Sequence, residues 1–237
     1  MMQDKVYMMR FGEEIDSCQA LLHPVFKERS KSIGNQIKRR AGMAAALLFQ
    51  YAVYRIFHTE VMDDSQIIEI FSAELQEMPA DCKGILPEIS YGPQGKPYVK
   101  DNVFCGQPLY FNLSHSEDMA VCAISSKEVG IDVQKCKDID FFGMAKRFFA
   151  PEEVRALENT TPEEQKSLFY RLWTYKEAYG KMTGQGVLAY LGKDFLQMMP
   201  ENENRTETTP ESCEERVLFQ EFSLVPDFYM TLCKQKQ

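Results

Sequence analysis

Two long segments with a helical spacing of apolar residues, one in each half of the chain, constrain the fold most. Residues 35–57 begin with basic residues and continue with apolar positions three and four apart, and residues 162–181 show the strongest helical pattern of the chain. Two apolar stretches of strand length follow each of these segments. The four stretches are 109–113, 119–125, 217–225 and 228–233. This order predicts an α+β fold made of two similar α/β halves.

A short polar break at residues 125–128 separates the two halves, and we place the boundary there, with domains 1–125 and 126–237. A weak internal echo between residues 118–123 and 227–233 agrees with two related halves. The remaining predicted elements are strands at 6–11 and 129–133, helices at 65–77 and 144–149, and a further helix that opens at Pro151. Glycine and proline predict a long loop at 87–108, and the polar residues 201–215 predict an exposed hairpin tip or flexible excursion.

The composition excludes several classes of protein. The 237 residues carry 27 Lys and Arg against 35 Asp and Glu, a net charge of −8, which argues against a broadly cationic nucleic-acid binder. Seven widely spaced cysteines form no CxxC pair, so neither a zinc site nor a disulfide framework is expected. No apolar run reaches the ~18 residues of a membrane span, and the N-terminus lacks a signal-peptide pattern. We expect a cytoplasmic protein that contacts no membrane.

The helix predicted at 162–181 has two chemically different faces. At about 100° per residue, Trp173, Glu177 and Lys181 share one face, and the apolar residues lie roughly opposite. The apolar set is Leu168, Leu172, Tyr175 and Tyr179. An ordinary amphipathic helix with one i,i+4 Glu–Lys pair would look the same, so this pattern alone leaves a structural reading open.

Two further segments carry polar residues beside apolar strands. In the strand at 129–133, alternation places Asp132 and Gln134 opposite Ile131 and Val133. Both polar residues could simply face solvent, but an unpaired carboxylate between apolar neighbours is costly, and a metal or a cation partner would explain it. Ser114 and His115 are predicted in a tight turn between two strands, where their side chains and backbone N–H groups could donate hydrogen bonds to an anion. An ST-turn with an incidental histidine is an equal alternative. A Ser-His-Asp hydrolase is not expected, because no GxSxG elbow exists.

Five motifs occur in a characteristic order along the chain. They are Gly95-Lys96-Pro97-Tyr98, Phe111-Asn112-Leu113-Ser114-His115-Ser116, Gly130-Ile131-Asp132-Val133, Ala145-Lys146-Arg147-Phe148-Phe149 and Leu172-Trp173-Thr174-Tyr175-Lys176-Glu177-Ala178-Tyr179-Gly180-Lys181. In this order and spacing they resemble the 4′-phosphopantetheinyl transferases, specifically the larger, two-halved Sfp-type class with a pseudo-dimeric fold. The resemblance runs from the basic first helix to about Gly186. Each motif alone is weak, and the order makes the resemblance specific.

The resemblance implies a reaction and its partners. Coenzyme A would donate its 4′-phosphopantetheine arm to a serine of an apo acyl or peptidyl carrier protein, with release of adenosine 3′,5′-bisphosphate. A divalent cation, Mg²⁺ or Mn²⁺, would neutralise charge on the pyrophosphate. The protein would be a monomeric enzyme, since both halves of the fold lie in one chain.

The resemblance also implies roles for individual residues. Asp132 and Glu177 would bind the metal, Lys181 would contact the pyrophosphate, and Glu177 would take the serine proton; Asp132, Glu177 and Lys181 are thus the catalytic set. The coenzyme A contacts would come from Lys31, Lys38, Arg39, Lys96, Pro97, Ser114, His115, Lys176 and Lys181. Which of Lys38, Arg39 and Arg40 holds the 3′-phosphate stays open. The N-terminal half would supply nucleotide and 3′-phosphate contacts, and the C-terminal half the metal site and catalytic helix.

One position departs from the pattern of the class. Gln134 stands where a third acid is usual, so it would be a neutral metal ligand or would hold a bound water, and we expect weaker metal binding than with three acids. This residue is the only support for an alternative, a non-catalytic member that binds coenzyme A or a carrier protein. A second alternative is a two-domain interaction protein whose polar helix face is merely solvated. For carrier docking, Lys137, Lys146, Arg147 and Lys176 could oppose an acidic partner, with apolar support from Phe141, Phe142, Phe148 and Phe149, unless those phenylalanines form core.

Overall fold

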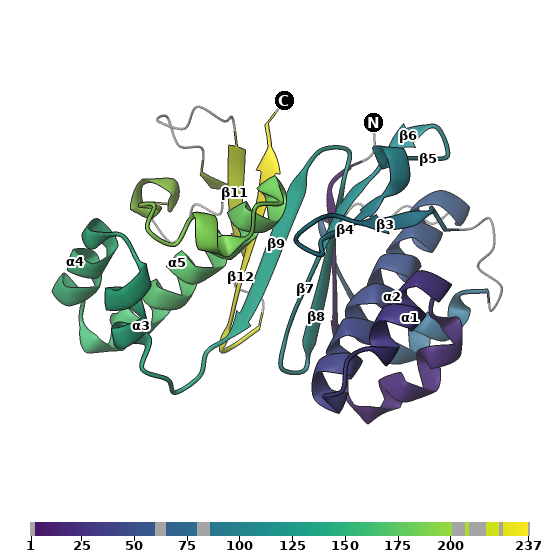
Figure 1. The fold of residues 1–237 in the computed structure, drawn as a ribbon, viewed down its shortest axis with the longest axis horizontal. Helices are drawn as coiled ribbons and strands as arrows, with labels where there is room; N and C mark the ends of the chain where they lie inside the picture. Colours follow the sequence, from purple (N-terminus) through teal and green to yellow (C-terminus); the bar gives the residue numbers. More distant parts are fainter. Residues whose placement is uncertain are drawn as a thin grey trace. The chain divides into compact units, whose positions relative to one another are not determined.

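The computed structural model describes residues 3–59, 65–79, 86–200, 207–208, 217–222 and 225–236, with only the backbone at 207–208. The chain divides into two compact units, Met1–Lys127 and Glu128–Gln237. Each unit has a four-stranded sheet with a long helix packed on it (Figure 1). The prediction of a mixed α+β fold is confirmed.

The first unit is a sheet in the order β2-β1-β8-β7, in which β1 and β2 are parallel and the other pairs antiparallel. Its strands and helices are β1 (Lys5–Arg10), η1 (Glu13–Leu21), α1 (Pro24–Lys31), α2 (Gln36–His58), β2 (Ile67–Ile70), η2 (Ser72–Glu77), β3 (Ile89–Tyr91), β4 (Pro97–Val99), η3 (Lys100–Asn102), β5 (Val103–Phe104), β6 (Gln107–Pro108), β7 (Tyr110–Ser116) and β8 (Met119–Ser125). The ring of Phe49 on α2 stacks on Phe111 of β7 with 3.9 Å between centroids, which fixes the helix on the sheet.

Local chemistry starts α2 at the predicted place. The side-chain oxygen of Asn35 accepts the backbone N–H of Lys38 at 3.0 Å, which caps the helix. From Ala41 to Val53 every residue of the helix is buried except Gly42, because this stretch is almost entirely apolar. The expected helix at 35–57 is confirmed.

The second unit is an antiparallel sheet in the order β10-β11-β12-β9. Its elements are β9 (Val129–Lys135), α3 (Phe141–Phe148), α4 (Pro151–Asn159), α5 (Pro162–Thr183), η4 (Val187–Ala189), η5 (Leu196–Met198), β10 (Glu207–Thr208), β11 (Val217–Phe222) and β12 (Phe228–Gln235). Helix α5 buries Leu172, Tyr175 and Tyr179, as its predicted apolar face requires. Gly184 ends it in the left-handed conformation, which glycine adopts without strain.

A long helix and three strands follow the same order in each unit, but the fourth strands differ, because β2 pairs with β1 and β10 pairs with β11. In the first, β1 leads through α2 to the hairpin β7–β8, and β8 pairs antiparallel with β1. In the second, β9 leads through α5 to the hairpin β11–β12, and β12 pairs antiparallel with β9. The two segments of the sequence echo are β8 and β12, the equivalent strands of these two arrangements.

Three local predictions are wrong or incomplete. Residues 65–77 do not form one helix, because the isoleucines of β2 pair with β1 and only Ser72–Glu77 turns helically. The 87–108 segment contains four short strands, β3 to β6, rather than loop alone. The Ser-His pair lies within β7 rather than in a turn, because that strand continues to Ser116. Of the predicted tip at 201–215 only Glu207–Thr208 is described, as β10, and the rest lies outside the described residues.

None of the helices that the structure describes is long and apolar enough to cross a membrane.

Candidate active site on α5 and β9

A buried carboxylate on β9 faces the polar side of α5. Asp132 is 1% exposed, and its Oδ1 lies 2.6 Å from the Nζ of Lys181. The same ammonium group donates to the carbonyl oxygen of Ile131 at 3.2 Å. The amide nitrogen of Gln134 donates to Asp132 Oδ2 at 3.1 Å. Both oxygens of the carboxylate therefore accept hydrogen bonds, one of them from a cation.

The backbone of β9 allows α5 to approach closely. A Cβ at Gly130 would lie 2.0 Å from the carbonyl oxygen of Ala178 and 2.4 Å from the nitrogen of Met182, so only glycine permits this contact. On the neighbouring strand, the hydroxyls of Thr174 and Thr231 lie 2.8 Å apart and tie α5 to β12. This packing brings the helix face with Lys181 to the strand with Asp132.

Glu177 lies one turn before Lys181 on α5 and is half-buried. Burial, and secondarily the negative charge of Asp132, raise the pKa of Glu177 to about 7, while the Lys181 ammonium opposes the shift. A carboxyl group with this pKa exchanges its proton near neutral pH, as a general base does. The structure thus brings together Asp132, Gln134, Glu177 and Lys181, as the sequence analysis expects.

The donor set suits a hard divalent cation. Among the described residues there is no group of three or more His, Cys, Asp or Glu side chains that could hold a metal. Asp132 and Glu177 interact strongly enough to shift a pKa, and Mg²⁺ commonly needs only one or two protein carboxylates beside water and phosphate oxygens. The residues present therefore fit a Mg²⁺ or Mn²⁺ ion.

Lys176 is a core residue. Its side chain and that of Glu153 on α4 are both 0% exposed, with Nζ 2.8 Å from Oε2. The carboxylate also accepts the backbone N–H groups of Ala150 and Phe195, and the ammonium donates to the Lys193 carbonyl. Burial lowers the pKa of Lys176 and raises that of Glu153, and each charge opposes the shift of the other. Lys176 is therefore a buried cation neutralised by Glu153, and the structure exposes no part of its side chain to coenzyme A or to a carrier protein.

The pair with Glu153 was missed by the sequence analysis. The available signal was the opening of α4 by Pro151, which placed Glu153 in the first turn, where it caps its own helix. Nothing in the local pattern paired it with a lysine more than twenty residues later.

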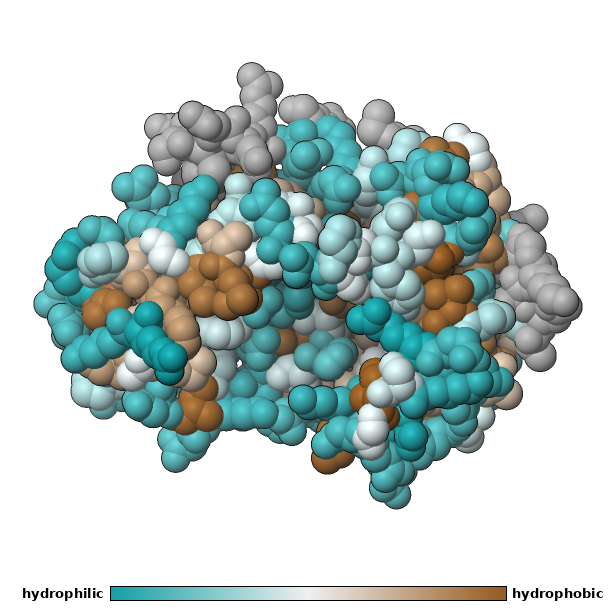
Figure 2. Space-filling view, in the orientation of Figure 1, coloured by the Kyte–Doolittle hydropathy of each residue, from teal (hydrophilic) through white to brown (hydrophobic). Residues whose placement is uncertain are grey.

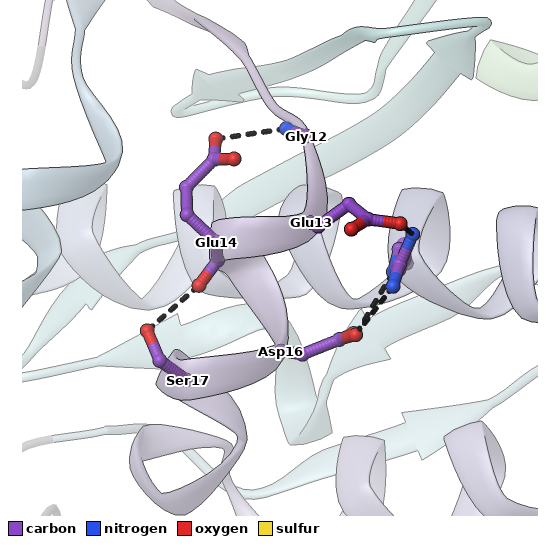
Figure 3. Close-up of polar contacts among 6 residues, drawn as sticks. Gly12, Glu13, Glu14, Asp16 and Ser17 are labelled. Atoms are coloured by element: carbon purple, nitrogen blue, oxygen red, sulfur yellow. Dashed lines mark hydrogen bonds and ion pairs between the residues drawn. The ribbon is translucent and has the colours of Figure 1, made fainter.

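The basic residues in the first two turns of α2 separate into two groups. Arg40 is 16% exposed and donates to Glu13 at 2.9 Å and to Asp16 at 2.7 Å, two residues of η1 that Figure 3 shows turned toward the same partner. Lys38 is exposed and Arg39 is half-buried. Arg40 thus fastens η1 to α2, and Lys38 and Arg39 are the better candidates for an anion.

Other predicted nucleotide contacts lie elsewhere in the first unit. Lys31 is exposed and pairs with Glu28 one turn earlier on α1. Lys96 and Pro97 follow a turn in which Gly95 has a φ of 77°, and the guanidinium of Arg29 lies next to that glycine. Arg29 also stacks over the ring of Tyr91 at 4.5 Å, a cation–π contact that the sequence analysis missed because the two residues are far apart in the chain.

The Ser-His pair alternates on β7 as strand geometry requires. Ser114 is buried and His115 exposed, so their side chains leave opposite faces of the strand.

Comparisons with known proteins point to one family. The family model of the 4′-phosphopantetheinyl transferase superfamily matches residues 128–233, the segment that holds β9 and α5. The chain is 31% identical over 195 residues to the 4′-phosphopantetheinyl transferase psf-1 of Bacillus pumilus, covering 81% of this chain and 77% of that protein. It is 33% identical over 169 residues to a 4′-phosphopantetheinyl transferase of Bacillus subtilis, covering 70% and 71%.

A third relative matches over a shorter segment. The 4′-phosphopantetheinyl transferase HetI of Nostoc sp. is 37% identical over 125 residues, and the match spans about half of each protein, 52% in both cases. Together with the family model, these similarities define a transferase class. The chain belongs to the 4′-phosphopantetheinyl transferase family, and the resemblance inferred from its five motifs is confirmed.

Proposed function

We propose that the protein transfers the 4′-phosphopantetheine arm of coenzyme A to a serine hydroxyl of an apo acyl or peptidyl carrier protein in the cytoplasm, acting as a monomer. The serine oxygen forms a bond to the pyrophosphate phosphorus that bears the pantetheine arm, and the bond from that phosphorus to the bridging oxygen breaks. Adenosine 3′,5′-bisphosphate leaves. The observation that carries the proposal is the cluster of Asp132, Glu177 and Lys181 at the contact of α5 with β9.

Each member of the cluster has a role that its chemistry supports. Asp132 and Glu177 would hold Mg²⁺ or Mn²⁺, which when bound supplies positive charge to the pyrophosphate oxygens. Lys181 would contact the pyrophosphate with its ammonium group. Glu177 would accept the serine proton, directly or through water, and the pKa of about 7 supports that role.

Residues of the first unit would supply the remaining coenzyme A contacts. Lys38 and Arg39, with Lys31, would bind the 3′-phosphate, and the ion pairs of Arg40 to η1 support its exclusion from this group. Lys96 and Pro97 would lie beside the nucleotide, and Ser114 and His115 would bind phosphate oxygens.

The carrier protein would dock on α3. Figure 2 shows apolar surface over this part of the second unit, and Phe141, Phe142 and Phe148 are half-buried there. Lys146 lies 4.5 Å from the centre of the Phe142 ring and Arg147 lies 5.0 Å from that of Phe148. Aromatic rings interleaved with exposed cations suit an acidic partner that also buries apolar surface.

The test is intact-mass analysis of an apo acyl carrier protein incubated with the protein, coenzyme A and Mg²⁺. We expect the carrier to gain one phosphopantetheine, and expect this gain to vanish with EDTA and with Glu177→Ala. Glu163→Ala, an exposed acid in the first turn of the same helix, is the matched control and should retain activity. Coenzyme A binding without any transfer to several carriers would instead support the non-catalytic alternative.

A further inference from the structure

The ion pair between Lys181 and Asp132 has a consequence for the order in which ligands bind. In the structure the Lys181 ammonium lies 2.6 Å from Asp132 Oδ1, and the Gln134 amide occupies Oδ2 as a donor. Asp132 is 1% exposed, so water contributes little to stabilising its charge. The lysine therefore acts as the counter-ion that the buried carboxylate needs.

A divalent cation at the same carboxylate would meet this lysine. Two cations that share one carboxylate repel each other, and the repulsion is strong where little water screens it. Gln134 adds no negative charge to compensate, because an amide is neutral. An anion that contacts both cations would remove this repulsion.

We propose that Lys181 is an internal competitor for the divalent cation, so that the metal binds weakly to the free protein and tightly only together with a pyrophosphate. The pyrophosphate would draw Lys181 from Asp132 and would neutralise lysine and metal at once. The metal and coenzyme A then bind cooperatively, and each increases the affinity of the protein for the other by the same factor. This inference rests on the proposed function for the identity of the pyrophosphate, but its first step concerns the protein and the metal alone.

The first experiment measures Mn²⁺ binding to the full chain without coenzyme A, by electron paramagnetic resonance of free Mn²⁺. We expect Lys181→Met to bind Mn²⁺ about tenfold more tightly than the wild type, a size typical of coupling between sites. Lys181→Arg keeps the cation and should bind as weakly as the wild type. An affinity of Lys181→Met equal to or below that of the wild type would overturn the proposal.

Removal of the counter-ion leaves Asp132 buried without a cation, so Lys181→Met could fold poorly without metal. Lys181→Gln, which keeps a hydrogen-bond donor, is the second variant, and the same rise in Mn²⁺ affinity is expected of it. Thermal unfolding adds an independent measure, because Mn²⁺ should raise the melting temperature of Lys181→Gln more than that of the wild type. Equal shifts would contradict the competition.

The second experiment repeats the Mn²⁺ titration with saturating coenzyme A. The wild type should gain about tenfold in Mn²⁺ affinity, and Lys181→Gln should gain much less, because its competitor is already absent. If the metal-only difference appears but no carrier protein is modified, the proposed function fails and the competition stands. If transfer occurs while Lys181→Gln and the wild type bind Mn²⁺ equally, the competition fails and the proposed function stands.

Discussion

At the scale of single residues, the fold controls the charge state of Glu177 near neutral pH. Its pKa of about 7 in the folded protein exceeds the ordinary value of 4.5, so between these two pH values the folded state holds more protons than the unfolded state. Ionisation of Glu177 therefore lowers stability as the pH rises through this window.

Glu177→Gln removes the titrating group and should remove this penalty. In metal-free buffer with EDTA, we expect the variant to gain stability relative to the wild type by about 2–3 kcal/mol between pH 4.5 and pH 8. Urea denaturation at a series of pH values measures the difference. A difference that stays constant with pH would mean that Glu177 titrates at its ordinary value.

At the scale of elements, the close contact of α5 with β9 depends on a glycine, Gly130, which has no side chain. Gly130→Ala would put a Cβ within 2.0–2.4 Å of two backbone atoms of the helix, and backbone atoms cannot rotate away. We expect a loss of about 2–3 kcal/mol in stability and a strong loss of carrier loading, since the displaced helix carries Glu177 and Lys181.

Gly192→Ala is the matched control for this variant. No atom lies within 4 Å of the Cβ position at Gly192, so this substitution should leave stability and loading close to the wild type. Chemical denaturation and the mass assay measure both effects. Equal behaviour of the two variants would show that the close approach at Gly130 is unimportant.

The start of α1 carries a second prediction at this scale. The Nδ1 of His23 accepts the backbone N–H of Val25 at 3.3 Å, which requires an unprotonated nitrogen, and burial lowers the pKa of His23. The contribution of this cap is present above the unfolded pKa near 6.5 and is lost as the pH falls through the lower folded value.

His23→Asn keeps a side-chain hydrogen-bond acceptor at the cap, an amide oxygen in place of Nδ1, and removes the titration. Between pH 7 and pH 5 we expect the wild type to lose more stability than this variant, measured by thermal unfolding followed by circular dichroism. Parallel pH profiles would argue against a neutral His23 cap.

At the scale of the whole molecule, the net charge of −8 opposes an acidic partner, so docking must depend on where the cations lie. Arg147→Glu on α3 should raise the KM for the carrier protein about tenfold and leave the KM for coenzyme A unchanged. Arg155→Glu on α4 changes the net charge by the same amount at another exposed position and should have little effect. If steady-state kinetics gave equal effects, total charge rather than the α3 surface would govern docking.

Most long helices and core strands were predictable because they depend on regular local patterns. Helical spacing located α2 and α5, and apolar runs located β8, β9, β11 and β12. The helix predicted at 65–77 is wrong because a run of isoleucines fits a helix or a strand equally well. Pairing of Ile67, Ile68 and Ile70 with β1 makes this run a strand. Local pattern does not contain that partner.

The sequence by itself determined the α+β class, the long helices and the family, because motif order and periodicity are properties of the chain. Only the tertiary structure decided which charged side chains are buried and which partner each of them contacts. Lys176 and Lys181 are five residues apart on one helix, yet the first is enclosed with Glu153 and the second reaches Asp132. Arg40 forms ion pairs with η1, while Lys38, two residues earlier, stays exposed. These differences arise because burial and ion pairing depend on residues distant in the chain, which packing alone brings into contact.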